Sequence, residues 1–182
     1  MVDKKNPWKT LSSKVVYKNS YFKISENKVI KPNGTRGMYG IIHIPPSAMI
    51  AAVTDKEEIY LIGQFRYISD KYSLELPSGA SDGEKTLGAA QRELQEETGL
   101  KAKSWKEIAT FYPSSGRMSE FTHVFLAQGL EESDTHEKES EGIKEVIKVP
   151  FKEALEMVRS GKIHDGQTII GIVQAAFTLG IL

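Results

Sequence analysis

The chain of 182 residues contains no cysteine. Disulfide bonds and thiolate metal sites are therefore excluded, and the composition is compatible with a reducing compartment. An excess of charge is also missing, because 24 Lys and Arg residues balance 24 Asp and Glu residues. No segment groups basic side chains with aromatic ones, so we expect no nucleic-acid partner.

Long apolar segments are missing as well. Residues 1–7 lead into no apolar region of the kind that a secretion signal needs. The most apolar stretch, residues 168–182, is too short to cross a bilayer and is interrupted by Gln174. We therefore expect a cytoplasmic protein with no membrane partner. The four histidines, His43, His123, His136 and His164, show no metal-ligand spacing and are expected to be structural or surface groups.

The apolar pattern indicates short strands, one central helix, further strands and two closing helices. Expected strands cover residues 14–17, 21–24, 28–30, 38–44, 48–53, 59–64, 74–77, 108–112, 121–127 and 143–149. The closing helices are expected at 152–159, with Gly161 as its stop, and at 168–182. This order predicts an α/β (α+β) fold in which helices sandwich a mixed sheet.

A domain boundary is predicted at Pro45-Pro46, where two prolines interrupt the strand pattern. Residues 1–44 would then form a small antiparallel sheet domain, and residues 45–182 would form the main domain. A sheet of three or four strands is marginally stable by itself. Dimerisation would give its second face something to bury against.

The most informative segment is residues 92–100, which read Arg-Glu-Leu-Gln-Glu-Glu-Thr-Gly-Leu, with Glu84 eight positions before Arg92. On a helix, Glu93 and Glu97 lie one turn apart on one face, with Glu96 beside them. Like charges at this spacing cost a few tenths of a kcal/mol per pair, which a hard cation such as Mg²⁺ would reverse. The alternative is a solvated charged helix with a surface ion pair worth under about 1 kcal/mol.

The helix that carries these acids has recognisable ends. Thr86 is the expected N-cap, and Gly99 stands where a glycine would stop the helix. Leu87, Ala90 and Leu94 form the expected apolar stripe. Arg92 and Glu96 are an i, i+4 pair that could fix the Glu96 carboxylate.

This segment resembles the Nudix box in letters and order, with residues 79–84, Gly-Ala-Ser-Asp-Gly-Glu, as its glycine loop. The loop is one residue shorter than the family's pattern. The resemblance implies a Nudix α/β/α sandwich whose loop-helix-loop binds divalent metal around a diphosphate and hydrolyses nucleoside diphosphates linked to another group. It further implies that Mg²⁺, replaceable by Mn²⁺, is held by Glu93, Glu96, Glu97 and the Ser78 carbonyl, with Arg92 and Glu96 in the catalytic group.

Residues outside the box are similar to the ADP-ribose and nucleoside diphosphate sugar pyrophosphatase branch of that family. The similar segments are the opening strands and residues 63–67, 74–79 and 160–165. The resemblance implies a homodimer that exchanges N-terminal sheets. It also implies substrate-binding roles for Arg66, Glu75, Glu120 and Gly79. Without it, Arg66 would be a solvated surface charge, Glu75 an outward polar residue of an alternating strand, and Glu120 a solvated acid.

An acidic loop at residues 131–142 holds six acids in twelve residues, which is usually a solvated segment. The branch places a catalytic acid there, and the resemblance implies Glu139 as general base and Glu141 as metal ligand. Ser115 stands where ADP-ribose hydrolases have a proline, so GDP-mannose and other nucleoside diphosphate sugars join ADP-ribose as expected substrates. Two alternatives stay open: a nucleotide-pool cleansing enzyme for modified nucleoside triphosphates, and a non-catalytic nucleotide-sugar sensor.

Overall fold

The computed structural model describes residues 4–133 and 142–182. The chain divides into two compact units. The N-terminal unit comprises Met1–Pro45 together with Ser114–Glu120, and the C-terminal unit comprises Pro46–Pro113 and Phe121–Leu182.

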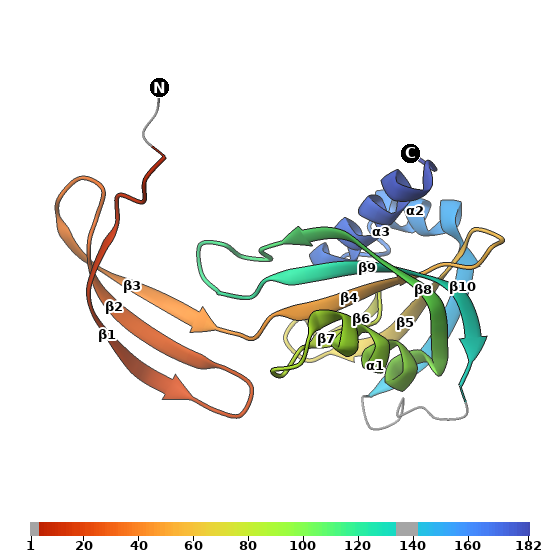
Figure 1. The fold of residues 1–182 in the computed structure, drawn as a ribbon, viewed down its shortest axis with the longest axis horizontal. Helices are drawn as coiled ribbons and strands as arrows, with labels where there is room; N and C mark the ends of the chain where they lie inside the picture. The colour runs from red at the N-terminus through yellow and green to blue at the C-terminus, as the bar shows by residue number, and fades with distance from the viewer. Residues whose placement is uncertain (1–3, 134–141) are drawn as a thin grey trace. The chain divides into compact units, whose positions relative to one another are not determined.

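The N-terminal unit is an antiparallel sheet in the order β1-β2-β3 (Figure 1), formed by β1 (Lys9–Lys18), β2 (Lys23–Ile30) and β3 (Arg36–His43). Residues 114–120, which the expected division assigns to the other domain, belong to this unit. They are held by two backbone hydrogen bonds to Ile42, one from the Ile42 N–H to Arg117 (2.9 Å) and one from the Ser119 N–H to Ile42 (2.9 Å).

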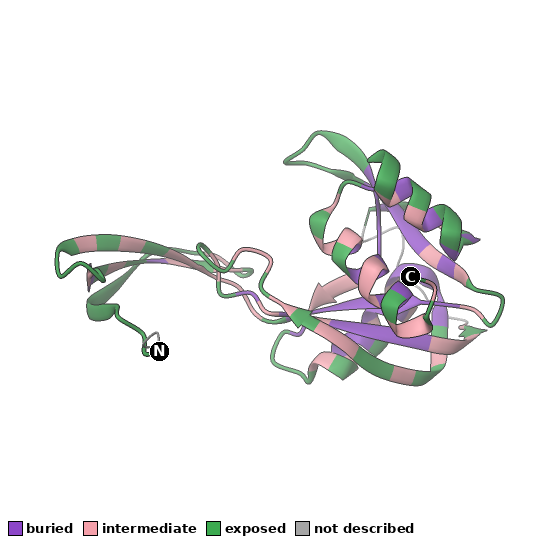
Figure 2. Cartoon of the chain, turned by 90° about the horizontal axis from the view of Figure 1, so that it is seen from above, coloured by how far each residue is buried: buried purple, intermediate pink, exposed green. Residues whose placement is uncertain are grey.

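One strand expectation in this sheet is wrong. Residues 21–24 and 28–30 were expected to be separate strands, but β2 runs without interruption through Glu26 and Asn27, which pair with Gly40 and Tyr39. Polar side chains are accommodated because this sheet is largely solvated, as the exposed colouring in Figure 2 shows. A polar dipeptide therefore marks no turn here.

The C-terminal unit contains a four-stranded and a three-stranded sheet. The first has the order β7-β4-β9-β8, formed by β4 (Ser47–Ala52), β7 (Ser78–Ala80), β8 (Leu100–Phe111) and β9 (Thr122–Glu132). The second has the order β10-β5-β6, formed by β5 (Glu58–Arg66), β6 (Lys71–Glu75) and β10 (Ile143–Pro150). Strands β4 and β9 are parallel and the other paired strands are antiparallel, so the expected mixed sheet is confirmed.

Helices cover both faces of the strands (Figure 1), with α1 (Thr86–Thr98) on one side and α2 (Phe151–Ser160) and α3 (Gly166–Leu179) on the other. Strand β4 shows why, because its side chains alternate between two apolar clusters. Met49 and Ala51 join the cluster with α2 and α3, whereas Ala48, Ile50 and Ala52 join the cluster with α1. A strand buried on both faces needs a helical layer on each, which confirms the α/β/α sandwich.

Helix α1 begins and buries its side chains differently from the expectation. Thr86 is its first residue, and the N-cap is Lys85, which makes no side-chain capping bond. Gly99 ends the helix in the left-handed conformation (φ 74°), as expected. Leu87 is 39% exposed and lies outside the buried face, because that face turns toward the acids: it contains Ala89, Ala90, Glu93, Leu94, Glu97 and Thr98.

No helix within residues 4–133 and 142–182 has both the length and the apolar composition that a membrane crossing requires.

Candidate active site

The glycine loop and the acidic helix meet through two backbone positions on β7. The Ser78 N–H donates a hydrogen bond to Glu97 Oε2 (2.8 Å). A Cβ on Gly79 would lie 1.9 Å from Glu93 Oε1, so the absence of a side chain there makes room for the Glu93 carboxylate. Glu93 and Glu97 are both less than 10% exposed. The structure thus brings together Ser78, Gly79, Glu93 and Glu97.

Arg92 connects three carboxylates and the loop. Its Nη1 donates to Glu93 Oε1 (2.7 Å) and Glu96 Oε2 (2.8 Å), and its Nε donates to Glu84 Oε1 (3.1 Å). Its Nη2 donates to the Ala80 carbonyl (3.1 Å). Partial burial alone would lower the pKa of Arg92, but its hydrogen bonds to the carboxylates raise that pKa above the ordinary value. The Arg92–Glu96 pair is therefore present, as part of a larger network.

The chemistry of this cluster suits a divalent cation. The negative formal charge of Glu84, Glu93, Glu96 and Glu97 exceeds the positive charge of Arg92, and all the donor atoms are oxygens, as Mg²⁺ and Mn²⁺ prefer. Room for the Glu93 carboxylate is kept by the missing side chain of Gly79. Within the part of the chain that the structure describes, no three His, Asp or Glu side chains are already grouped as a metal cage.

Arg66 and Glu75, predicted separately as substrate-binding residues, form an ion pair with each other. Arg66 Nε donates to Glu75 Oε1 (2.9 Å), and Nη2 donates to Glu75 Oε2. The Glu75 side chain is 6% exposed and that of Arg66 is 49% exposed. Reading Glu75 as an outward residue is therefore wrong, and so is reading Arg66 as a merely solvated charge. Because a guanidinium is planar, its Nη1 edge faces away from Glu75.

This ion pair shifts the pKa of both side chains. The hydrogen bond to Glu75 raises the pKa of Arg66. Burial would raise the pKa of Glu75, but the hydrogen bond and charge of Arg66 outweigh it and hold that pKa below its usual range. His164 adds to the effect on Glu75, and Asp165 and Glu97 add to the effect on Arg66. The sequence predicts no functional role for His164 or Asp165. Their segment, residues 160–165, is nevertheless one of those that resemble the family.

Three further predicted site residues are Glu120, Glu139 and Glu141. Glu120 is buried, so reading it as a solvated acid is wrong, and it ends the 114–120 segment of the N-terminal unit. Glu139 and Glu141 fall outside the described residues. Their assignments as base and metal ligand stay predictions.

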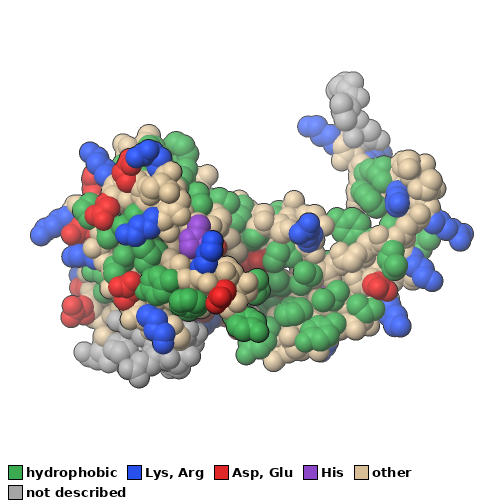
Figure 3. Space-filling model, turned by 180° about the vertical axis from the view of Figure 1, so that it is seen from behind, with side chains coloured by type: hydrophobic (Ala, Val, Ile, Leu, Met, Phe, Trp, Pro, Cys, Tyr) green, Lys and Arg blue, Asp and Glu red, His purple; other side chains and the backbone are tan. Residues whose placement is uncertain are grey.

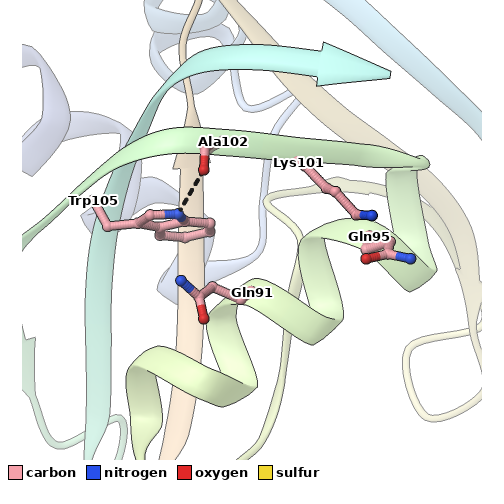
Figure 4. Close-up of a pocket in the computed structure, with 5 residues that line it drawn as sticks. All are labelled: Gln91, Gln95, Lys101, Ala102 and Trp105. Carbon is pink, nitrogen blue, oxygen red and sulfur yellow. Dashed lines mark hydrogen bonds between the residues drawn. The ribbon is translucent and has the colours of Figure 1, made fainter. Parts of the chain in front are cut away.

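A cavity of about 210 Å³ next to α1 is separate from the carboxylates. It is lined by Gln91, Gln95, Lys101, Ala102 and Trp105, and the Trp105 indole donates to the Ala102 carbonyl (3.1 Å; Figure 4). Gln91 and Gln95 are one turn apart, and each is two residues before Glu93 or Glu97, which is about 200° around a helix. The cavity therefore opens on the opposite side of α1.

Two family models match the chain. A family model described as the NUDIX domain matches residues 43–168. The chain belongs to the Nudix family. A second family model, the nucleoside diphosphate sugar hydrolase N-terminal domain, matches residues 8–42. The Nudix resemblance drawn from the sequence is therefore confirmed.

Individual Nudix relatives cover most of the chain. The ADP-ribose pyrophosphatase of Bacillus subtilis (strain 168) is 32% identical over 166 residues, which is 90% of each protein. The GDP-mannose pyrophosphatase of Cronobacter sakazakii is 32% identical over 133 residues, covering 68% of this chain and 69% of that one. A crystal structure of an ADP compounds hydrolase shares the fold, with a TM-score of 0.85 over 98% of this chain and 97% of that one, at 20% identity.

The close approach of Gly79 to Glu93 can be tested by Gly79→Ala. The new Cβ would collide with the Glu93 carboxylate, so we expect the free energy of unfolding to fall by about 1–3 kcal/mol. Denaturant titration measures it. Gly166→Ala is the control, because nothing lies within 4 Å of a Cβ at Gly166. Equal free energies of unfolding for the two variants would contradict the prediction, because the Glu93 carboxylate would then move aside without loss of stability.

The Arg66–Glu75 pair predicts a pH dependence. A carboxyl with a lowered pKa in the folded state stabilises the protein above its unfolded pKa, and this contribution disappears as the pH falls through the folded value. Glu75→Gln should therefore lower the free energy of unfolding by about 1.5–3 kcal/mol at pH 7. The difference from the parent should shrink below the ordinary carboxyl pKa of 4.5.

Denaturant titrations of both proteins between pH 3 and pH 7 measure this difference. Glu156→Gln is a matched control, because Glu156 also pairs with an arginine, Arg159, but both side chains are well exposed. We expect its stability to stay close to that of the parent at every pH. A constant difference between Glu75→Gln and the parent across the range would contradict the assignment.

Proposed function

We propose that this Nudix enzyme hydrolyses the diphosphate bond of nucleoside diphosphate sugars and releases a nucleoside monophosphate and a sugar phosphate. The observation that carries the proposal is the burial of Glu93 and Glu97 against Ser78 and Gly79, with Arg92 orienting Glu93 and Glu96. The names of the relatives support the substrate class, since one is an ADP-ribose pyrophosphatase and another a GDP-mannose pyrophosphatase.

The proposed metal is Mg²⁺, replaceable by Mn²⁺, held by Glu93, Glu96, Glu97 and the Ser78 carbonyl. When bound, it would neutralise charge on the diphosphate and lower the pKa of the attacking water. Arg92 keeps Glu93 and Glu96 in place for that task. Glu139 is the proposed acceptor of the water's proton and Glu141 a further ligand.

Arg66 is the proposed diphosphate-binding side chain. Glu75 holds its Nε and Nη2, so the guanidinium plane is already oriented and its Nη1 edge remains for phosphate oxygens. A pre-oriented side chain loses less conformational entropy on binding. Glu75 thus serves the substrate by fixing Arg66.

A substrate panel with a pair of box variants tests the function. The parent should cleave ADP-ribose, GDP-mannose or a related nucleoside diphosphate sugar in Mg²⁺, with products identified by chromatography. Glu97→Gln should lower kcat by 10²-fold or more, about 3 kcal/mol of transition-state stabilisation. Glu96→Gln is the matched comparison and should lose less if the main task of Glu96 is to pair with Arg92.

Three results would contradict the proposal. Near-normal turnover of Glu97→Gln at saturating Mg²⁺ would exclude Glu97 as a ligand. Cleavage of nucleoside triphosphates alone would favour the cleansing alternative. Binding of a nucleoside diphosphate sugar without cleavage would favour the sensor.

We further propose a cytoplasmic homodimer that forms through exchanged N-terminal sheets. Every residue of β1 is exposed, and its exposed side chains include the large apolar Leu11, Val15, Val16 and Tyr17. Apolar side chains gather over this sheet in the view of Figure 3. Such a patch on a small sheet is typical of an interaction surface.

Light scattering tests this dimer. The parent should have the mass of two chains, and Val15→Glu should shift it toward one, because a charge would enter the buried interface. Ser12→Glu places the same charge on an already polar position of β1 and should leave the dimer intact. A monomeric parent would exclude the proposed assembly.

A further inference from the structure

The first turn of α3 is joined to residues 76–77, the short connection between β6 and β7. Asp165 caps the helix, its carboxylate accepting a hydrogen bond from the Thr168 N–H (2.7 Å). The hydroxyl of Thr168 in turn accepts a hydrogen bond from the Leu76 N–H (3.1 Å). Thr168 and Leu76 are both fully buried. The Thr168 side chain therefore links the helix N-terminus to the backbone of the β6–β7 connection, away from water.

The Leu76 peptide lies between the two halves of the candidate active site. Glu75, which holds Arg66, precedes it, and Ser78, which donates to Glu97, follows two residues later. The intervening Pro77 carbonyl accepts a hydrogen bond from the Ile50 N–H on β4 (2.9 Å). The backbone from Glu75 to Ser78 is thus held by α3, by β4 and by α1.

Packing makes the same connection between α3 and Leu76. A Cβ on Gly171, one turn after Thr168, would lie 2.5 Å from Leu76 Cδ1. The helix therefore approaches the β6–β7 connection closely, and the hydroxyl of Thr168 has a fixed position. Without it, the buried Leu76 N–H would lose its partner, and a backbone shift toward another acceptor would move the neighbouring Glu75 and Ser78.

We propose that Thr168 is a positioning residue for hydrolysis: through the Leu76 peptide it sets the Glu75–Arg66 pair on one side and the Ser78 backbone on the other. This inference rests on the function proposed above. It assigns to α3, on the other side of the strands from α1, a part in aligning the substrate-binding arginine with the box carboxylates.

Three variants separate positioning from simple stability. Thr168→Val keeps the shape but removes the acceptor, and Thr168→Ser restores the hydroxyl. Ile172→Val is the control, because Ile172 is fully buried in the same helix and its truncation weakens packing without touching the Leu76 hydrogen bond. Thr168→Cys, whose sulfur is a weak acceptor, replaces Thr168→Val if the latter does not fold.

Two measurements are made on each variant. Steady-state kinetics on the parent's best substrate should show kcat/KM at least tenfold lower for Thr168→Val, through a lower kcat and a higher KM. The same ratio should stay within threefold of the parent for Thr168→Ser and Ile172→Val. Amide hydrogen exchange is measured by NMR in metal-free protein, as the ratio of the Leu76 rate to the Ala176 rate. This ratio should be at least tenfold higher than in the parent for Thr168→Val and unchanged for Thr168→Ser and Ile172→Val.

The outcomes are distinct. Full activity of folded Thr168→Val, or of Thr168→Cys in its place, would overturn the inference while leaving the proposed function intact. Parallel losses in Thr168→Val and Ile172→Val, without a selective change at Leu76, would overturn it in favour of a stability effect. A parent that cleaves no nucleoside diphosphate sugar would refute the proposed function itself, and the inference with it.

Discussion

The burial of two carboxylates on one helix is the constraint on which the rest of the C-terminal unit depends. Glu93 and Glu97 face the strands and not the solvent, and removing a carboxylate from water is costly unless hydrogen bonds replace its hydration. The Ser78 N–H and the Arg92 guanidinium supply such bonds. Gly79 must therefore stay without a side chain, and β7 must stay close to α1. The glycine loop and the helix depend on each other, because the loop backbone and the helix carboxylates are hydrogen-bond partners.

The same constraint explains where sequence reasoning succeeded and failed on α1. The acids, the Arg92–Glu96 spacing and the Gly99 stop depend only on local helical geometry, and all could be recognised from the letters. Of the expected apolar stripe, Ala90 and Leu94 are buried and only Leu87 is wrong, because the expectation keeps the acids beside the packed face. In the structure the acids lie within the buried face, so Leu87 is turned outward. The error came from the usual rule that charges avoid interiors.

Pairing between residues apart in sequence was beyond the reach of such reasoning. In the β5–β6 hairpin, Ile62 pairs with Glu75 and Arg66 with Lys71, so Arg66 and Glu75 share one face and their long side chains can meet along it. That register cannot be read from either strand alone. The bond between Thr168 and Leu76 spans 92 positions. Similarly, the polar residues Glu26 and Asn27 resemble a turn, and only their partners on β3 show that they continue a strand. The sequence therefore indicates which side chains are chemically important. The contacts that orient those side chains depend on tertiary structure.

The division of the chain into two units separates Ser115, which the family resemblance connects with substrate choice, from the proposed catalytic groups. The box carboxylates, Arg66, Glu75 and Thr168 all belong to the C-terminal unit, whereas Ser115 lies in the segment assigned to the N-terminal unit. That segment is fixed by Ile42, and the Tyr39 hydroxyl donates to the Gly116 carbonyl (2.8 Å). Changes in this loop would leave the hydrogen bonds of Glu93, Glu97 and Arg92 untouched. Relatives of equal identity to this chain are named for ADP-ribose in one case and GDP-mannose in another, so overall identity does not by itself decide the substrate.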